Sequence, residues 1–274
     1  MTDKCTELQA ILLDWAGTTV DYGSRAPARV FQEIFERRGV PITESQAREP
    51  MGMAKREHIE AIAAMEEVDA AWKEKYGTST TEEDIDGMYA DFLPLQMETL
   101  GQHCDLIPGV VEAVEGCRSL GLKIASSTGY THELMDIVVP AAEKQGYRPD
   151  CVLCSGDTPV GRPAPFLLHE AAKEFGIYPM WRFIKVDDTP VGVEAGRNAG
   201  CWSVGITRSG NCVGKSQEEL EAMSQAEVDS LCKNAEDTLL AAGAHYILES
   251  AADILPLVKQ IDAKLAAGER PQFL

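Results

Sequence analysis

Short apolar segments alternate with amphipathic helical segments along most of this chain, and that alternation limits its folds more than any other feature. Strands that alternate with helices favour a parallel sheet covered by helices on both faces. The predicted strands are segments 8–15, 121–127, 150–155, 182–188 and 201–206, and the predicted helices between them are 109–119, 131–145, 163–176 and 190–199. We therefore expect an α/β fold with a doubly wound, Rossmann-like parallel sheet, in which ligands bind beyond the C-terminal ends of the strands.

One long segment interrupts this alternation. Residues 22–100 carry helical signals and no convincing strand. Ala26-Pro27 begins a helix that Gly39 ends. Further helices fit segments 43–49, 54–67, 69–77 and 81–100. We expect a helical cap domain at 22–100, inserted after the first strand of a catalytic core made of 1–21 and 101–274.

Composition narrows the classes of partner. The formal net charge of the 274 residues is −19, which disfavours binding to nucleic acid or to an anionic membrane. No apolar run reaches the about 18 residues of a membrane helix, and the N-terminus is polar, so we expect a cytoplasmic protein. The 8 cysteines are then reduced. Cys151 and Cys154 form a C-x-x-C within a predicted strand, which is more typical of two packed thiols than of a redox or zinc site.

The first predicted strand ends in Asp14, and Gly17 follows it. A glycine there lets the backbone turn sharply, so that peptide N–H groups can face an anion. The fragment is equally compatible with a strand-ending aspartate that caps the next turn.

Two further carboxylates, Asp187 and Asp188, end the strand predicted at 182–188. Adjacent buried carboxylates repel each other and are costly to desolvate, and a bound cation removes that cost. Hard oxygen ligands of this kind suit Mg²⁺. An exposed Asp-Asp turn before a helix is the alternative. The metal interpretation is favoured, more strongly once Asp14 is included.

Two more segments have the composition of an anion site. The segment 126–129, Ser-Ser-Thr-Gly, follows a strand and can hold a phosphoryl oxygen through hydroxyl and N–H groups. Arg162 precedes the helix predicted at 163–176, with Pro163 in its first turn. Taken alone, an ordinary helix cap and a surface arginine are the simpler interpretations.

The predicted cap carries an unusual helix start. Lys55, His58, Ile59 and Ile62 stand at i, i+3, i+4 and i+7, which is one helix face. Burial, the helix dipole and the adjacent Arg56 all push Lys55 towards its neutral, nucleophilic form. The commoner alternative is a snorkelling lysine beside a core histidine.

Taken together, these residues resemble the haloacid dehalogenase superfamily and, within it, the phosphonatases. The resemblance rests on segments 14–23, 37–43, 50–58, 126–138, 145–150, 161–165 and 187–205. Its most discriminating parts are Ala16 and the cap segment PMGMAKREH (50–58). Most phosphatases of the superfamily carry a second aspartate, used as acid/base, where Ala16 stands.

The resemblance implies a role for each matched residue. Asp14 would be the nucleophile and a Mg²⁺ ligand, with the Ala16 carbonyl and Asp188 as further ligands. Lys55 would form a Schiff base, with His58 and Met51 lining its pocket and His58 as proton shuttle. Thr128, Gly129 and Arg162 would bind the phosphoryl group.

The implied activity is hydrolysis of phosphonoacetaldehyde, a small-molecule phosphonate, to acetaldehyde and phosphate in 2-aminoethylphosphonate degradation, by a homodimer. The alternatives are a capped phosphate-ester phosphatase or phosphomutase, against which Ala16 argues, and a catalytically silent binding module. The sequence departs from the pattern of some relatives at two positions. It has Gly192 in place of an aspartate and Asp187 in place of a glycine, so either Asp187 or water would complete the metal shell. Residues 207–250 carry no interpretable motif and lead to a predicted edge strand, GAHYILES.

Overall fold

One six-stranded parallel sheet organises the protein, seen here in a computed structural model that describes residues 4–272. The strands are β1 (Ala10–Leu13), β2 (Lys123–Ser127), β3 (Cys151–Leu153), β4 (Phe183–Asp187), β5 (Trp202–Ile206) and β6 (Tyr246–Leu248). Their order is β3-β2-β1-β4-β5-β6, so the winding reverses between β1 and β4. A crevice for ligands forms at such a reversal, beyond the C-terminal ends of the strands. The expected doubly wound, Rossmann-like fold is confirmed, and GAHYILES supplies the edge strand β6.

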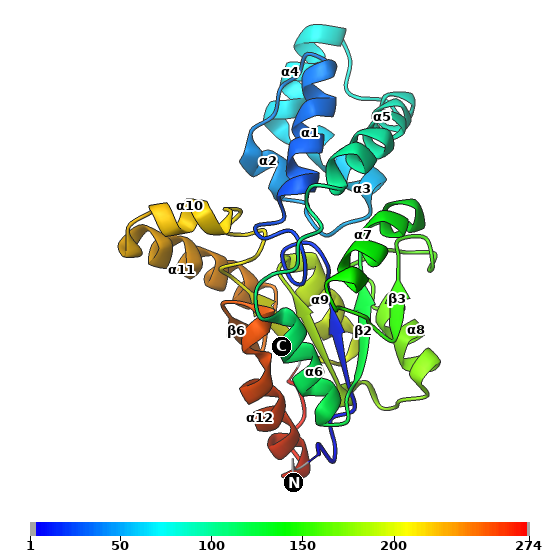
Figure 1. The fold of residues 1–274 in the computed structure, drawn as a ribbon. Coiled ribbons are helices and arrows are strands. Elements are labelled where there is room, and N and C mark those ends of the chain that lie inside the picture. Colours follow the sequence, from blue (N-terminus) through cyan, green and yellow to red (C-terminus); the bar gives the residue numbers. More distant parts are fainter. Residues whose placement is uncertain (1–3, 273–274) are drawn as a thin grey trace.

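Helices cover both faces of the sheet (Figure 1). Alternate residues of a strand point to opposite faces. Ile11 and Leu13 of β1 accordingly pack with three helices on one face, whereas Ala10 and Leu12 pack with two helices on the other. The first group is α6 (Val110–Ser119), α7 (His132–Lys144) and α12 (Ile254–Ala266), and the second is α8 (Phe166–Phe175) and α9 (Pro190–Ala199).

A purely helical lobe lies beyond the C-terminal ends of the strands, at the top of Figure 1. It consists of α1 (Arg25–Arg37), α2 (Glu44–Arg48), α3 (Lys55–Ala63), α4 (Glu66–Tyr76) and α5 (Glu82–Leu100). Its buried apolar side chains, such as Phe31, Trp72 and Phe92, form a cluster of their own. We refer to this lobe as the cap. The domain boundaries at 21/22 and 100/101 stay a prediction.

The segment 207–245, between β5 and β6, forms an arm beside the sheet, which Figure 1 shows in yellow and orange. It contains α10 (Gln217–Ala222) and α11 (Gln225–Ala241), each begun by a serine capping box. Two short 3₁₀ turns complete the described chain, η1 (Met180–Arg182) and η2 (Ala251–Asp253). Within residues 4–272, no helix combines the length and the apolar composition that a bilayer crossing requires.

Helix boundaries were predicted wrongly in two places. In the cap, the helix predicted at 54–67 ends at Ala63, and the next helix begins at Glu66 and not at 69. The other place is the start of α8. Helix α8 begins at Phe166, and not at Pro163. Ala164 precedes Pro165, and the ring of a following proline disfavours helical backbone at the residue before it. The segment instead makes a turn in which the Ala164 N–H donates to the carbonyl of Gly161. Arg162 therefore lies in a loop ahead of the helix.

Candidate active site

The loop after β1 brings Asp14 to the reversal point of the sheet. The Asp14 N–H donates to the Val186 carbonyl of β4, and its carboxyl group is buried. Gly17 has a positive φ of 82°. A Cβ at Gly17 would lie 2.1 Å from Oδ2 of Asp188, so only glycine lets this loop approach the end of β4 so closely.

Asp188 is held in place by two neighbouring loops. Its Oδ1 accepts a hydrogen bond from the Thr18 hydroxyl at 3.0 Å, and its Oδ2 accepts one from the Asn211 backbone N–H at 2.8 Å. Asn211 belongs to segment 207–250, for which the sequence offered no interpretation. The Asn211 side chain also accepts a bond from Arg48 of the cap, at 3.1 Å.

Asp14, Asp187 and Asp188 form one buried carboxylate group, in which an oxygen of each lies within 4.8 Å of the others. Among residues 4–272, only two cations, Arg162 and Lys185, pair with this group within ion-pair distance. Burial, followed by repulsion from Asp14 and Asp187, raises the pKa of Asp188 well above its ordinary value. Burial and Asp187 also raise the pKa of Asp14, against the opposing effect of Arg162 and Lys185.

A further cation would relieve this excess of buried negative charge. The donors are hard carboxylate and carbonyl oxygens, the type that Mg²⁺ prefers. Asp14, Asp188 and the Ala16 carbonyl were predicted as ligands. The charge balance of the carboxylate group and its donor chemistry therefore fit a divalent cation of this kind.

Arg162 connects Asp14 to the end of β4. Its Nη1 donates to Oδ1 of Asp14 at 3.0 Å and to Oδ2 of Asp187 at 2.8 Å. Its Nε is buried without a partner among the described residues. The side chain lines the cavity described below, so the Nε–H group can donate to a bound anion.

Lys185 is a residue of the site that the sequence reasoning missed. It is fully buried on β4, and its Nζ lies 2.9 Å from Oδ2 of Asp187 and 3.1 Å from the Ser127 hydroxyl. A signal was present, because a lysine in the middle of the apolar strand RFIKVDD is rarely buried without a charged partner.

Thr128 and Gly129 follow β2, as predicted, and both line the cavity. The Thr128 hydroxyl accepts a hydrogen bond from the Tyr130 N–H at 3.1 Å. A Cβ at Gly129 would lie 2.7 Å from the Met53 carbonyl, so this loop lies directly under the cap. Tyr130 was not predicted, yet its ring lines the cavity and its hydroxyl is buried without a partner among the described residues.

Lys55 begins α3 of the cap and reaches the same cavity as Asp14. The Lys55 Nζ lies 4.8 Å from the centroid of the Tyr130 ring and 5.5 Å from that of Phe31. Within residues 4–272, no carboxylate lies within ion-pair distance of it. Burial, and next the positive charge of Arg162, lower the pKa of Lys55 to about 7, although Asp14 partly opposes this.

His58 was predicted to line the pocket of Lys55, but it lies one turn further along α3, packed into the cap, and does not line the cavity. Its ring stacks on Phe31 at a centroid distance of 3.7 Å, and its Nε2 lies 2.9 Å from the Ala47 carbonyl. A carbonyl only accepts, so Nε2 carries the proton, and Nδ1 is a buried acceptor with no partner among the described residues. Burial, and next the charge of Lys55, keep the pKa of His58 well below its usual value.

The cavity lies between the cap and the core and has a volume of about 280 Å³, including its open mouth. Of the predicted residues, it brings together Asp14, Ala16, Met51, Lys55, Thr128, Gly129 and Arg162. Asp188 belongs to the carboxylate group beside it. Gly52 and Thr189 complete the contact between cap and core.

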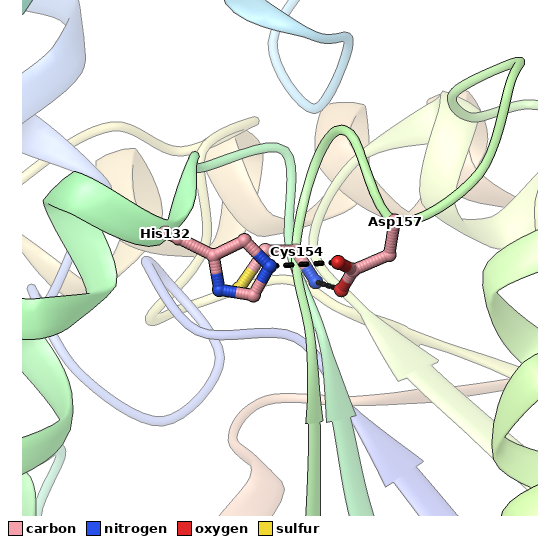
Figure 2. A group of neighbouring side chains, drawn as sticks. All are labelled: His132, Cys154 and Asp157. Carbon is pink, nitrogen blue, oxygen red and sulfur yellow. Dashed lines mark hydrogen bonds and ion pairs between the residues drawn. The ribbon is translucent and has the colours of Figure 1, made fainter.

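A second group of potential metal donors lies outside this cavity (Figure 2). His132 of α7 pairs through Nε2 with Oδ1 of Asp157 at 2.7 Å, and Oδ2 of Asp157 accepts the Cys154 N–H at 2.7 Å. Burial and the nearby Asp157 raise the pKa of the Cys154 thiol to about 12. These contacts satisfy the histidine and carboxylate as an ion pair that closes the turn after β3. Cys154 lies beyond the end of β3, and both it and Cys151 are free thiols.

Comparisons with known proteins identify the family of this chain. The profile of the haloacid dehalogenase-like hydrolases matches residues 8–200. A protein of Paraburkholderia phytofirmans named phosphonoacetaldehyde hydrolase is 46% identical over 96% of this chain and 99% of its own length. Its namesake in Paraburkholderia xenovorans is 44% identical over the same shares.

Solved structures give the same result. The crystal structure of a phosphonoacetaldehyde hydrolase-like protein from Oleispira antarctica superposes with a TM-score of 0.95 at 38% identity, covering 99% of this chain and 98% of the other. A β-phosphoglucomutase from Clostridium difficile, with a TM-score of 0.67 and 15% identity over 95% of this chain and 99% of its own, shares the fold alone. The chain belongs to the haloacid dehalogenase-like hydrolases and, within them, to the phosphonoacetaldehyde hydrolase family.

Proposed function

We propose that this hydrolase cleaves the carbon–phosphorus bond of phosphonoacetaldehyde, releasing acetaldehyde and phosphate, and that it serves 2-aminoethylphosphonate degradation. One observation carries the proposal. The buried amine of Lys55, from the cap, and the carboxyl group of Asp14, from the core, line one small cavity. The names of the full-length relatives support the same substrate.

A carbon–phosphorus bond resists direct hydrolysis because the departing carbon would leave as a carbanion. Lys55 removes this obstacle by condensing with the aldehyde, which releases water and forms an iminium ion. The positive nitrogen then accepts the electron pair of the breaking bond, and the leaving group is a neutral enamine. A lysine with a pKa of about 7 is substantially neutral at physiological pH, as this condensation requires.

Asp14 attacks the phosphorus atom and becomes an aspartyl-phosphate, which water hydrolyses to phosphate. Protonation of the enamine carbon gives an iminium ion again, and its hydrolysis releases acetaldehyde and regenerates Lys55. The free Nε–H of Arg162 and the loop at Thr128 and Gly129 hold the phosphoryl oxygens. His58 lies one turn from Lys55 on α3, and its Nδ1 has no partner among the described residues, so we assign it, directly or through water, to proton transfer during imine formation.

Asp14, Asp188 and the Ala16 carbonyl are the groups that would hold Mg²⁺. When bound, the ion supplies positive charge that offsets the charge of the phosphoryl oxygens. Ala16 fits this chemistry, because an enamine needs no proton from position 16 in order to leave. A phosphate ester would release an alkoxide, which does need one.

The alternatives are a phosphate-ester phosphatase or mutase and a silent binding module. One assay separates them, in which acetaldehyde and phosphate are measured from phosphonoacetaldehyde with and without EDTA. The proposal expects both products in equal amounts and their loss with EDTA. Phosphate release from simple esters without any aldehyde product would support the phosphatase, and no turnover of either substrate would support the binding module. The homodimer and the cytoplasmic location stay predictions, to be checked by sedimentation and cell fractionation.

A further inference from the structure

A second cavity lies between the cap and the arm, and it shares no lining residue with the cavity of Asp14 and Lys55. Helices α1 and α2 form its cap side, and the start of α10 with the residues just before it forms its arm side (Figure 1). Its volume is about 440 Å³, including its open mouth. The charged residues that line it are Arg25, Arg29, Glu44, Arg48, Lys215 and Glu219.

The charge of this lining is opposite in sign to the charge of the whole chain. Four cations and two carboxylates give the cavity an excess of two positive charges, whereas the formal net charge of the protein is −19. Cations gathered around one cavity repel each other, and a bound anion relieves that repulsion. A cleft lined by one sign of charge also concentrates ions of the opposite sign from solution. The cavity therefore has the electrostatics of an anion site.

One cation of the lining, Arg48, already has its partners within the protein. It pairs with Glu44 at 2.9 Å and donates to the carbonyls of Gly23 and Gly214 at 2.8 and 3.0 Å. The charges of Arg48 and Glu44 therefore offset each other, and the excess positive charge belongs to the remaining three cations.

Those three cations, Arg25, Arg29 and Lys215, have one carboxylate of the lining between them, Glu219. Nη1 of Arg25 lies 4.0 Å from Oε2 of Glu219, and that oxygen already accepts the Ser216 N–H at 2.7 Å. The pKa of Glu219 is lowered first by this N–H and next by the charges of Arg25 and Lys215. Among residues 4–272, Arg29 and Lys215 have no ion pair and no side-chain hydrogen bond. Both side chains are therefore available to a ligand.

We propose that this cavity binds a small dianionic oxyanion, phosphate or a phosphonate, between Arg29 of the cap and Lys215 of the arm. A guanidinium pairs with such an anion through two parallel hydrogen bonds, and an ammonium group adds a point charge. A charge of −2 matches the excess of two positive charges in the lining. Because Arg29 belongs to α1 and Lys215 to the arm, the bound anion links the cap to the arm. The site is separate from the cavity of the proposed function and does not rest on it.

The test measures the binding of inorganic phosphate to the full chain by titration calorimetry in EDTA. Without a bound cation, the three buried carboxylates of the other cavity repel a dianion, so that cavity does not contribute. We expect one phosphate per chain. Arg29→Gln and Lys215→Gln should each weaken binding about tenfold, the usual effect of losing a charge-assisted hydrogen bond, and the double variant should not bind measurably. Methylphosphonate is titrated in parallel, and the tighter of the two anions identifies whether phosphate or a phosphonate is the ligand.

Lys173→Gln/Lys233→Gln is the matched control, because it also removes two positive charges, but from exposed lysines of α8 and α11. It should leave phosphate binding unchanged. Phosphate in EDTA should raise the unfolding temperature of the wild-type and control proteins, but not that of Arg29→Gln/Lys215→Gln.

Three results would overturn the proposal. They are an equal loss of affinity in the control, no binding of either anion to the wild-type protein, and displacement of phosphate by an equal concentration of chloride. Circular dichroism shows whether each variant folds, and the two single variants decide the outcome if the double variant does not. No step of the test uses phosphonoacetaldehyde, so a wrong substrate assignment would not affect the result.

Discussion

Gly52 of the cap lies so close to Thr189 of the core that a Cβ on Gly52 would be 2.4 Å from the Thr189 hydroxyl oxygen. That hydroxyl group donates to Oδ1 of Asp187, and Gly52 has a φ of +95°. The cap can therefore lie this close to the carboxylate group of Asp14, Asp187 and Asp188 only because residue 52 has no side chain.

The first prediction follows from this contact. Gly52→Ala should hold the cap away from the core and lower kcat/KM about 100-fold, because a displacement of about 1 Å in a catalytic site has that effect. Gly77→Ala is the matched control, since Gly77 also has a positive φ, +84°, but a Cβ there would meet nothing within 4 Å. Both variants carry backbone strain, and only the first should lose activity. Equal activities in a steady-state assay would contradict this account of cap closure.

Lys55→Arg should abolish turnover without unfolding the protein. Arginine keeps the positive charge and most of the length of lysine, but its guanidinium does not condense with an aldehyde. Borohydride added with phosphonoacetaldehyde should reduce the imine and add a two-carbon or phosphonoethyl mass at Lys55, found by peptide mass spectrometry. Lys173→Arg, at an exposed lysine of α8, should keep full activity. Labelling at another lysine would show that this other residue, and not Lys55, forms the Schiff base.

The pH dependence of the reaction should report the ionisation of Lys55. The folded pKa is lowered from 10.5 to about 7, so the neutral amine is lost as pH falls below about 7. We expect kcat/KM to fall about tenfold for each pH unit below that value and to level off above it. His58 has its pKa held well below 6.5 and Tyr130 has its pKa well above 10.0, so neither titrates in this window. The rate of Lys55 acylation, followed by mass spectrometry, should show the same midpoint. A midpoint near 10 would contradict burial of the amine.

Magnesium should stabilise the folded protein even without substrate. Three buried carboxylates face two protein cations, so an added divalent ion relieves repulsion that the unfolded chain does not have. Binding to the native state alone contributes about 2.7 kcal/mol at a concentration 100 times the dissociation constant. The unfolding temperature, followed by circular dichroism, should rise with Mg²⁺ and return to its starting value with EDTA. Asp188→Asn should lose this response, and Asp157→Asn should retain it.

Arg48 should be needed to fix the cap on the core. Its guanidinium donates to the carbonyls of Gly23 and Gly214 at 2.8 and 3.0 Å, and to the Asn211 side chain. Arg48→Met keeps most of the packing volume and leaves these acceptors without a charged donor. We expect a loss of about 2 kcal/mol in the free energy of unfolding, measured with urea. Arg37→Met removes only an exposed i,i+4 pair with Glu33, and it should cost less than about 0.5 kcal/mol.

Much of the fold followed from local patterns. Five apolar runs became β1 to β5, and the strand-free segment after β1 became the five helices of the cap. Periodicity was sufficient here because a parallel strand buried on both faces needs a continuous apolar run, whereas a helix needs one apolar stripe. We predicted Asp14, Asp188 and Lys55 as site residues for a related reason. They stand at the ends of strands and at the start of a helix, and such positions can be inferred from the local sequence.

Contacts between distant segments were decided only by the tertiary structure. Asp14 and Arg162 are 148 residues apart, and Asn211 reaches Asp188 from a segment whose sequence carried no signal. Sequence alone left open whether Asp187 or water would complete the metal shell. In the structure, the Asp187 carboxylate pairs with Lys185 and fills the space that a side chain at position 192 would need. Such choices depend on which charges are buried together, because the energy of a buried charge is set by its neighbours in space and not by its neighbours in sequence.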